Sequence, residues 1–282
     1  MRKMRSIFFS RLLCSAAWAV FSLSFSGDAL ALEDAPRDGV AGKEISADIL
    51  WKGEITVNGK VTVLTGATLT IAPRTTVRFA EGAGLLVKGR IIAEGEPDGI
   101  ITFTSLGRKE PSSWDEISLE SATGSRFVHC IFEYATWGLH GHFTQFLVKD
   151  SRFRSNHGGI RFMSGFAEIR HSVFDDNHVG VRWRAGNGLI EENVITRNEF
   201  GCFIKEKGGK LTIRNNDIFA NKGYNIRVGD FVDMDVNAES NWWGPGDPIE
   251  KIYDGRREPG LGKVHYEPFL REPVRPAFHE GL

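Results

Sequence analysis

The sequence predicts an all-β fold, a parallel β-solenoid in which a unit of about 21 residues makes one turn. Phe132, Phe153 and Phe174 follow one another at intervals of 21 residues, and the positions around them repeat as well. Within each unit, short runs alternate apolar and polar residues between Gly, Asn and Asp, a period that is typical of strands. Stacked turns place equivalent positions about 4.8 Å apart, so their inward residues form one continuous core.

Further columns of equivalent positions support the same unit. The Phe132 column continues to Ile195 and Ile218. A second apolar column comprises Leu139, Ile160, Val181, Cys202 and Ile226, and a third comprises Phe127, Val148, Ile169, Ile190 and Ile213. A leucine-rich repeat would need its Leu and Asn signature, and a propeller blade would need about twice this length, so neither architecture fits.

The dipeptide Asn-His occurs at the same place in two successive units. The Asn column comprises Asn156, Asn177, Asn198 and Asn221, and the next column comprises His157, His178, Glu199 and Lys222. Asn tolerates the left-handed backbone of a tight corner, and its amide can form hydrogen bonds along a stack. We therefore interpret the Asn column as a corner of the scaffold and the two histidines as exposed corner residues.

A second polar column bears on the cysteines. It comprises Cys130, Ser151, Ser172, Asn193 and Asn216. Cys130 thus lies in a corner column, whereas Cys202 lies in an inward strand column three turns later. Three rungs of about 4.8 Å separate the two thiols by roughly 14 Å, which exceeds the reach of a disulfide. We predict two buried free thiols.

The N-terminus has the features of a secretory signal peptide. Basic residues precede an apolar run at 12–25, and Ala29-Leu30-Ala31 forms an A-x-A cleavage site. The run is too short for a transmembrane helix, so we expect cleavage near Ala31 and a periplasmic or extracellular protein with no transmembrane segment. Residues 1–31 hold four of the 35 basic and one of the 36 acidic residues, so the remaining chain has a net charge of −4. This charge gives no reason to expect nucleic acid or an anionic membrane as partner.

We predict one domain that is capped at both ends. Residues 1–31 are the signal peptide, 32–48 an N-terminal cap, 49–245 the parallel solenoid, and 246–282 a C-terminal capping segment with a tail. Caps cover open strand edges that would otherwise recruit other chains. Trp242 is expected to close the apolar core, and DPIEKIYD, with Asp before Pro, is expected to begin a short helix.

The units FRSNHGGIRF, FDDNHVGVRW and ITRNEFGCFI resemble the parallel β-helix repeats of the pectate-lyase-like superfamily. ATLTIAPRTTVRF resembles the opening coils of secreted bacterial β-helix proteins, and NWWGPGDPIEKIYDGR resembles their closing segment. The resemblance covers nearly all of the chain after Ala31 and implies a single-stranded right-handed parallel β-helix, whose handedness comes from the resemblance alone. It implies little about function, because the superfamily contains lyases, hydrolases, epimerases, binding proteins and surface scaffolds.

An enzyme with this fold would need acidic and basic groups gathered on one outer face. The candidate catalytic residues are Asp175, Asp176, His178 and Arg182. Polygalacturonase-like glycosidases use several aspartates, but their Asp arrangement is incomplete here and their Arg-x-Lys element is missing. A calcium-dependent lyase needs several carboxylates around the ion, whereas Ser155 and Arg197 neighbour Asp176 in its column. Calcium is therefore expected only if the chain is a lyase, and no other metal or cofactor is predicted.

Unit length and one outward column favour a binding protein. Regular units leave little room for the long loops that form cleft walls in enzymes. The column comprises His140, Arg161, Arg182, Phe203 and Arg227, with Arg184 and Lys205 in the next one. These residues could hold an acidic polysaccharide through charge-assisted hydrogen bonds and stacking, or could be solvated strand surface.

The sequence therefore predicts an exported, monomeric, non-catalytic solenoid that binds a polysaccharide or another cell-envelope component along its side. A polysaccharide lyase or glycoside hydrolase is the alternative prediction, and a purely structural surface module is a further one.

Overall fold

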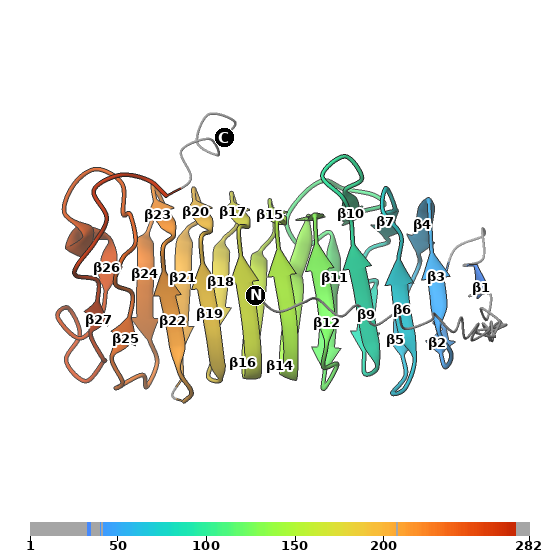
Figure 1. Ribbon diagram of the computed structural model, residues 1–282, viewed down its shortest axis with the longest axis horizontal. Helices are drawn as coiled ribbons and strands as arrows, with labels where there is room; N and C mark the ends of the chain where they lie inside the picture. The colour runs from blue at the N-terminus through green and yellow to red at the C-terminus, as the bar shows by residue number, and fades with distance from the viewer. Residues whose placement is uncertain (1–32, 35–39, 41, 207, 275–282) are drawn as a thin grey trace, which may run out of the picture. The chain divides into compact units, whose positions relative to one another are not determined.

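A computed structural model of the protein describes residues 33–34, 40, 42–206 and 208–274, and the predicted signal peptide lies outside these ranges. The described residues form two parallel sheets, one of 19 strands and one of eight (Figure 1). Successive strands of each sheet come from successive turns of the chain, so the predicted all-β parallel solenoid is confirmed. Each full turn contributes a strand to each of three stacks, which we call stacks A, B and C.

The two sheets are built from these stacks. Stack A contains β2 (Glu44–Ile45), β5 (Lys60–Val63), β8 (Gly84–Val87), β11 (Trp114–Glu120), the first parts of β14 (Ala135–Lys149) and β16 (Gly158–Arg170), β18 (Val179–Trp183), β21 (Phe200–Lys205), β24 (Tyr224–Gly229) and β26 (Ile252–Tyr253). Stack B contains β1 (Glu33–Asp34), β3 (Ile49–Trp51), β6 (Thr68–Ile71), β9 (Arg90–Glu94), β12 (Ser125–Val128), the second parts of β14 and β16, β19 (Asn187–Glu191), β22 (Leu211–Arg214), β25 (Val236–Asn237) and β27 (Val264–His265).

Stack C is the eight-stranded sheet. It contains β4 (Glu54–Val57), β7 (Thr76–Phe79), β10 (Ile101–Ser105), β13 (Cys130–Glu133), β15 (Arg152–Arg154), β17 (Val173–Asp175), β20 (Val194–Thr196) and β23 (Asp217–Phe219). Because β14 and β16 run through both of the other stacks, stacks A and B together form the 19-stranded sheet.

The predicted aromatic column forms the centre of the core. Phe132, Phe153 and Phe174 are fully buried, and their rings stack with centroid separations of 4.4 and 4.9 Å. The prediction that Trp242 closes this column is wrong. Trp242 pairs with Asp217, so Trp243 occupies the place after Ile218, and Trp243 is the buried residue. The turn before it is longer than its predecessors, which shifts the column by one position.

The predicted Asn corner is present as a hydrogen-bonded ladder. Asn177 Oδ1 accepts from both the backbone N–H and the side-chain amide of Asn156, each at 3.0 Å, and Asn177 donates in the same way to Asn198. The left-handed backbone, however, belongs to the residue before each Asn, as at Asp176 with φ 55°. The Asn side chain therefore satisfies the backbone of the corner and does not itself adopt the strained conformation.

The second polar column forms a similar ladder between stacks B and C. Cys130 N–H donates to Ser151 Oγ at 3.0 Å, and Ser151 N–H donates to Ser172 Oγ at 3.2 Å. Both cysteines are buried and free. Burial raises the pKa of the Cys202 thiol to about 12 and raises that of Cys130 as well, so both behave as small apolar side chains.

Parallel pairing extends to both sides of residues 49–245, through β1 and β2 at one end and β26 and β27 at the other. The predicted short helix is a single 3-10 turn, η1 (Pro248–Lys251), and Asp247 caps it by accepting from Ile249 N–H at 3.1 Å. In the part of the chain that the structure describes, no helix is long and apolar enough to span a membrane.

Candidate binding face on stack A

The outward column predicted from the sequence lies on stack A. Strand register places His140 beside Arg161, Arg161 beside Arg182, Arg182 beside Phe203, and Phe203 beside Arg227. We call these five residues the arginine stripe. They come from β14, β16, β18, β21 and β24, which are neighbours along the solenoid (Figure 1). The rigid ladder of strands fixes their spacing at about 4.8 Å per turn.

Aromatic rings hold the guanidinium groups of the stripe in place. Arg161 lies over the ring of Trp137, with 5.3 Å between the guanidinium carbon and the ring centroid. Arg182 and Arg227 both lie over Phe203, at 5.6 and 5.3 Å. Such cation–π contacts are worth about 0.5–1 kcal/mol each at exposed sites. Because strand register puts Phe203 between the two arginines, a sugar could stack on this ring only by displacing one of them.

Arg227 has the most aromatic surroundings of the three arginines. Its guanidinium carbon lies 5.3 Å from the centroid of Phe200 and 5.4 Å from that of Tyr253, in addition to Phe203. Tyr224 is covered in turn by Arg257, at 5.8 Å. The aromatic rings around Arg227 cover its guanidinium group so that Nε is buried, while the terminal nitrogens stay at the surface.

Two arginines of the stripe have no anionic partner in the described part of the chain. No carboxylate there lies within 4.0 Å of the guanidinium of Arg182 or Arg227. Only the Nε atom of each is both buried and without a hydrogen bond, so their terminal nitrogens face solvent. Burial lowers the pKa of Arg182 and the charges of Arg161 and Arg184 lower it further, while the more distant carboxylates of Glu206 and Asp230 act in the opposite direction without reversing the shift. A group with these properties gains from an external anion.

The neighbouring outward column is neutralised within the protein. Arg184 forms an ion pair with Glu206, and Lys205 forms one with Asp230. These two cations therefore add little uncompensated positive charge beside the stripe.

One contact of the stripe, the carboxylate of Glu116 on β11, does not follow from the 21-residue period. Glu116 Oε1 lies 2.9 Å from His140 Nδ1 and Oε2 lies 3.7 Å from Arg161 Nη2. Arg161 Nη2 lies 2.8 Å from the same Nδ1 atom. Burial raises the pKa of Glu116, but the hydrogen bond and the charges of His140 and Arg161 outweigh it, so the net shift is downward. Next to it, burial and the charge of Glu116 raise the pKa of Asp115.

The structure does not bring the four candidate catalytic residues together. Asp175 is buried on stack C, where it accepts two hydrogen bonds from Arg152, at 2.8 and 2.7 Å, and one from Arg197 at 2.9 Å. Asp176 is an exposed corner residue that pairs with Arg197 at 3.1 Å. Both carboxylates are thus engaged with arginines of neighbouring turns.

The other two candidates make different contacts. His178 stacks on His157, with ring centroids 5.1 Å apart, and Arg182 belongs to the stripe on stack A. Burial lowers the pKa of His157, and the charges of His178 and Arg182 lower it further. No hydrogen bond or ion pair between described residues joins Asp175 or Asp176 to His178 or Arg182. Nor do the described residues include a group of three or more His, Cys, Asp or Glu side chains that could hold a metal ion.

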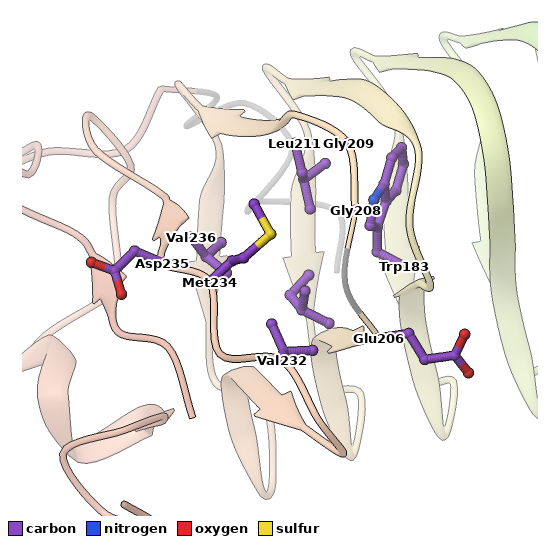
Figure 2. A pocket seen from close by; sticks show the side chains of 10 residues that line it. Trp183, Glu206, Gly208, Gly209, Leu211, Val232, Met234, Asp235 and Val236 are labelled. Carbon is purple, nitrogen blue, oxygen red and sulfur yellow. The ribbon is translucent and has the colours of Figure 1, made fainter. Parts of the chain in front are cut away.

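A small pocket lies near the C-terminal turns, apart from the stripe (Figure 2). Its apolar lining includes Trp183, Leu211 and Met234, and Glu206 and Asp235 lie at its edges. The buried Trp183 Nε1 has no hydrogen-bond partner in the described part of the chain. None of the five stripe residues lines this pocket.

Comparison with known proteins agrees with the fold. A family model described as a right-handed beta helix region matches residues 138–242. No curated protein and no solved structure matches the chain. The matched segment contains the whole arginine stripe, so the stripe lies on regular turns of a right-handed parallel β-helix.

Proposed function

We propose that this right-handed parallel β-helix is exported and binds an acidic polysaccharide of the cell envelope along stack A, without cleaving it. The observation that carries the proposal is the pair of solvent-facing guanidinium groups of Arg182 and Arg227, which have no anionic partner among the described residues. A guanidinium group presents donors in a planar fork that matches carboxylate and sulfate oxygens. Aromatic contacts hold both groups before a ligand arrives, which reduces the entropy lost on binding.

The regular spacing of the stripe suits a polymer with repeated acid groups. Arg161 and Arg182 are one turn apart, about 4.8 Å, and Arg182 and Arg227 are two turns apart, about 9.6 Å. A chain that lies along the stack could meet several of these groups at once, and each further contact would form at a high effective concentration. A small anion would use only one of them.

Local charge, and not net charge, supports the choice of an anionic ligand. The full chain has a net charge of −1, so the molecule as a whole does not attract polyanions. Arg182 and Arg227 of the stripe have no carboxylate within ion-pair distance among the described residues, whereas the arginines beside Asp175 are paired. Binding should therefore be specific to stack A and should weaken as salt screens the charges.

The contacts of the candidate catalytic carboxylates speak against cleavage of the polymer. Glycoside hydrolysis needs one carboxylic acid and one carboxylate that are both free to reach the scissile bond. Asp175 is buried under two guanidinium groups, and Asp176 faces Arg197 at a strained corner. These contacts favour a structural role for both aspartates.

A binding and cleavage assay on matched polymers tests the proposal. The chain without residues 1–31 is applied to immobilised polygalacturonate and to its fully methyl-esterified form, which has the same backbone without the charges. We expect retention on the acid form only, with release by salt and no new reducing ends with or without calcium. Equal retention on both forms would contradict the proposed ligand class. Release of reducing ends that is abolished in Asp176→Asn would show that the protein is an enzyme.

A further inference from the structure

Uncompensated cations occur at every second turn along the C-terminal half of the arginine stripe. Strand register orders five residues, one from each successive turn: Arg161, Arg182, Phe203, Arg227 and Tyr253, which continues the column beyond the stripe. Among the described residues, no carboxylate lies within 4.0 Å of the guanidinium of Arg182 or Arg227. These two cations are two turns apart, with an uncharged residue between them and another after them.

The position between the two cations is apolar. Arg182 and Arg227 lie against the ring of Phe203 from the turns before and after it, at 5.6 and 5.3 Å. An acid group that faced this ring would lose water and find no donor on the ring. An uncharged sugar can instead pack its C–H groups against the ring and the arginine side chains. The two guanidinium groups are about 9.6 Å apart along the stack, so each can bind an acid group of its own.

The position after Arg227 is also unfavourable for an acid group. The ring of Tyr253 lies 5.4 Å from the Arg227 guanidinium carbon, and its hydroxyl donates to Glu258 Oε2 at 2.7 Å. The carboxylate of Glu258 would repel a second anion at this turn. Arg257 of the same loop donates three hydrogen bonds to main-chain carbonyls. This turn therefore favours an uncharged sugar as well.

The cation before Arg182 is compensated within the protein. Arg161 Nη2 lies 3.7 Å from Glu116 Oε2. A guanidinium that already has a carboxylate neighbour gains less from an external anion, and that carboxylate repels the anion. The attraction for acid groups is therefore concentrated at Arg182 and Arg227.

We propose that the ligand is a polysaccharide in which acidic and uncharged sugars alternate, so that one acid group meets the stripe for every two sugars. The inference rests on the proposed function and specifies the class of polymer that the stripe binds. One pyranose of an extended chain advances by nearly the same distance as one turn of the solenoid. Acid groups at Arg182 and Arg227 then leave one sugar between them, at Phe203, and the second contact forms at a high effective concentration. A polymer with an acid group on every sugar must desolvate the additional charges or turn them away.

Calorimetry with two oligomers of equal sugar number tests the inference. Hyaluronan oligomers alternate glucuronate with uncharged N-acetylglucosamine, whereas polygalacturonate oligomers carry an acid group on every sugar. At one pH and salt concentration, we expect the hyaluronan oligomer to bind about tenfold more tightly, although it has half as many charges. Equal affinity, or tighter binding of polygalacturonate, would overturn the inference and leave the proposed function standing. If neither oligomer binds, the proposed function fails together with the inference.

A substitution at the apolar position should reverse the preference. Phe203→Arg places a third cation between Arg182 and Arg227. We expect its affinity for the polygalacturonate oligomer to rise about tenfold, while that for the hyaluronan oligomer stays within about twofold. Phe203→Leu keeps the position apolar and is the control, which should still prefer hyaluronan. A gain of the same size with both oligomers in Phe203→Arg would show that this turn does not distinguish acidic from uncharged sugars, and would overturn the inference.

Discussion

Two arginines of the stripe on stack A and the arginines at the centre of stack C differ in whether they are paired with carboxylates. On stack C, the buried Asp175 is bound by Arg152 and Arg197, which come from the turns before and after it. On stack A, Arg182 and Arg227 occupy equivalent outward positions and have no carboxylate partner in the described ranges. Both faces are stacks of parallel strands from the same turns, so the difference comes from the side chains.

The comparison shows on which face the placement of charged residues can be explained by folding stability alone. In a β-helix each outward residue has a neighbour one turn above and one below, so an opposite charge can be placed beside any cation. Stack B follows this rule as well, with Glu191 between Arg170 and Arg214. A column of like charges gives up that stabilisation, and partial burial adds a desolvation cost. Such a column is what the proposed binding of an anionic ligand would require.

The largest expected effect on stability comes from breaking the Asn ladder, whose buried hydrogen-bonding groups are paired. Asn177→Ala removes the acceptor of two hydrogen bonds and leaves buried donors of Asn156 unpaired. Each such group costs about 1–3 kcal/mol, so we expect the free energy of unfolding to fall by about 3 kcal/mol. Denaturant unfolding measures it.

The neighbouring corner residue is the control for this prediction. Asp176→Gly removes an exposed ion pair with Arg197 but places a glycine at a left-handed position, φ 55°. Glycine adopts this conformation without strain, and exposed ion pairs contribute little. We expect a change within about 0.5 kcal/mol. A larger loss than in Asn177→Ala would mean that the corner depends on Asp176 and not on the ladder.

A smaller loss of stability is expected from neutralising Asp175, the buried acid at the centre of stack C. Asp175→Asn leaves the two guanidinium groups of Arg152 and Arg197 next to each other without their carboxylate. Breaking a buried ion pair costs about 3–5 kcal/mol, but both arginines are partly exposed and can turn to water, so we expect about 2 kcal/mol. Binding of polygalacturonate should be unchanged, since the site is on another face. If Asp175→Asn were as stable as the unaltered protein but no longer bound polygalacturonate, the roles assigned to the two stacks would be reversed.

Removing a charge from the arginine stripe should have the opposite effect to removing one from stack C: binding should weaken while stability is kept. Arg182→Met keeps most of the side-chain volume over Phe203 but removes a partly buried charge that neighbours Arg161 and Arg184. We expect the free energy of unfolding to stay the same or rise by about 0.5 kcal/mol, while the affinity for the acidic polymer falls about tenfold. Thermal unfolding and calorimetry of one sample test both halves. A clear loss of stability would indicate that the arginine is structural.

The smallest expected effect is a pH dependence of stability from the histidine next to the stripe. Burial, followed by the charges of His178 and Arg182, lowers the pKa of His157 in the folded chain. The unfolded chain therefore binds the proton more readily, and stability is lost as the pH falls below about 6.5. His157→Asn should reduce the loss in unfolding free energy between pH 7.5 and 5.5. An unchanged pH dependence in that variant would show that His157 does not contribute.

Much of the fold could be predicted because every turn places the same kind of residue at equivalent positions. An inward position must be apolar in each turn, so Phe132, Phe153 and Phe174 reveal both the period and the core. The Asn ladder could be predicted for the same reason. Its backbone geometry could not, because the left-handed residues vary in type, as at Ser155 and Asp176. The position of Trp243 depended on the length of an irregular loop, which periodicity does not give.

The candidate site could be predicted only in part. The outward column of Arg161, Arg182 and Arg227 follows from the same period. Glu116 was missed because the spacing is looser before residue 127, and strand register shifts between Glu116 and Ile117. Whether Arg182 and Arg227 have partners among the described residues depends on side-chain conformations and on which carboxylates of other turns reach them. These are properties of the folded surface and leave no pattern in the sequence.

The most direct test of the account compares two double variants with the same loss of charge. Arg182→Gln/Arg227→Gln alters the stripe, and Arg126→Gln/Arg214→Gln alters two paired arginines of stack B. The measurement is the dissociation constant for a polygalacturonate oligomer at one pH and salt concentration. The account predicts that the stripe variant binds about a hundredfold more weakly, whereas the stack B variant binds like the unaltered protein. Equal weakening in both would show that the polymer responds to total charge, and the arginine stripe would then not be the binding site.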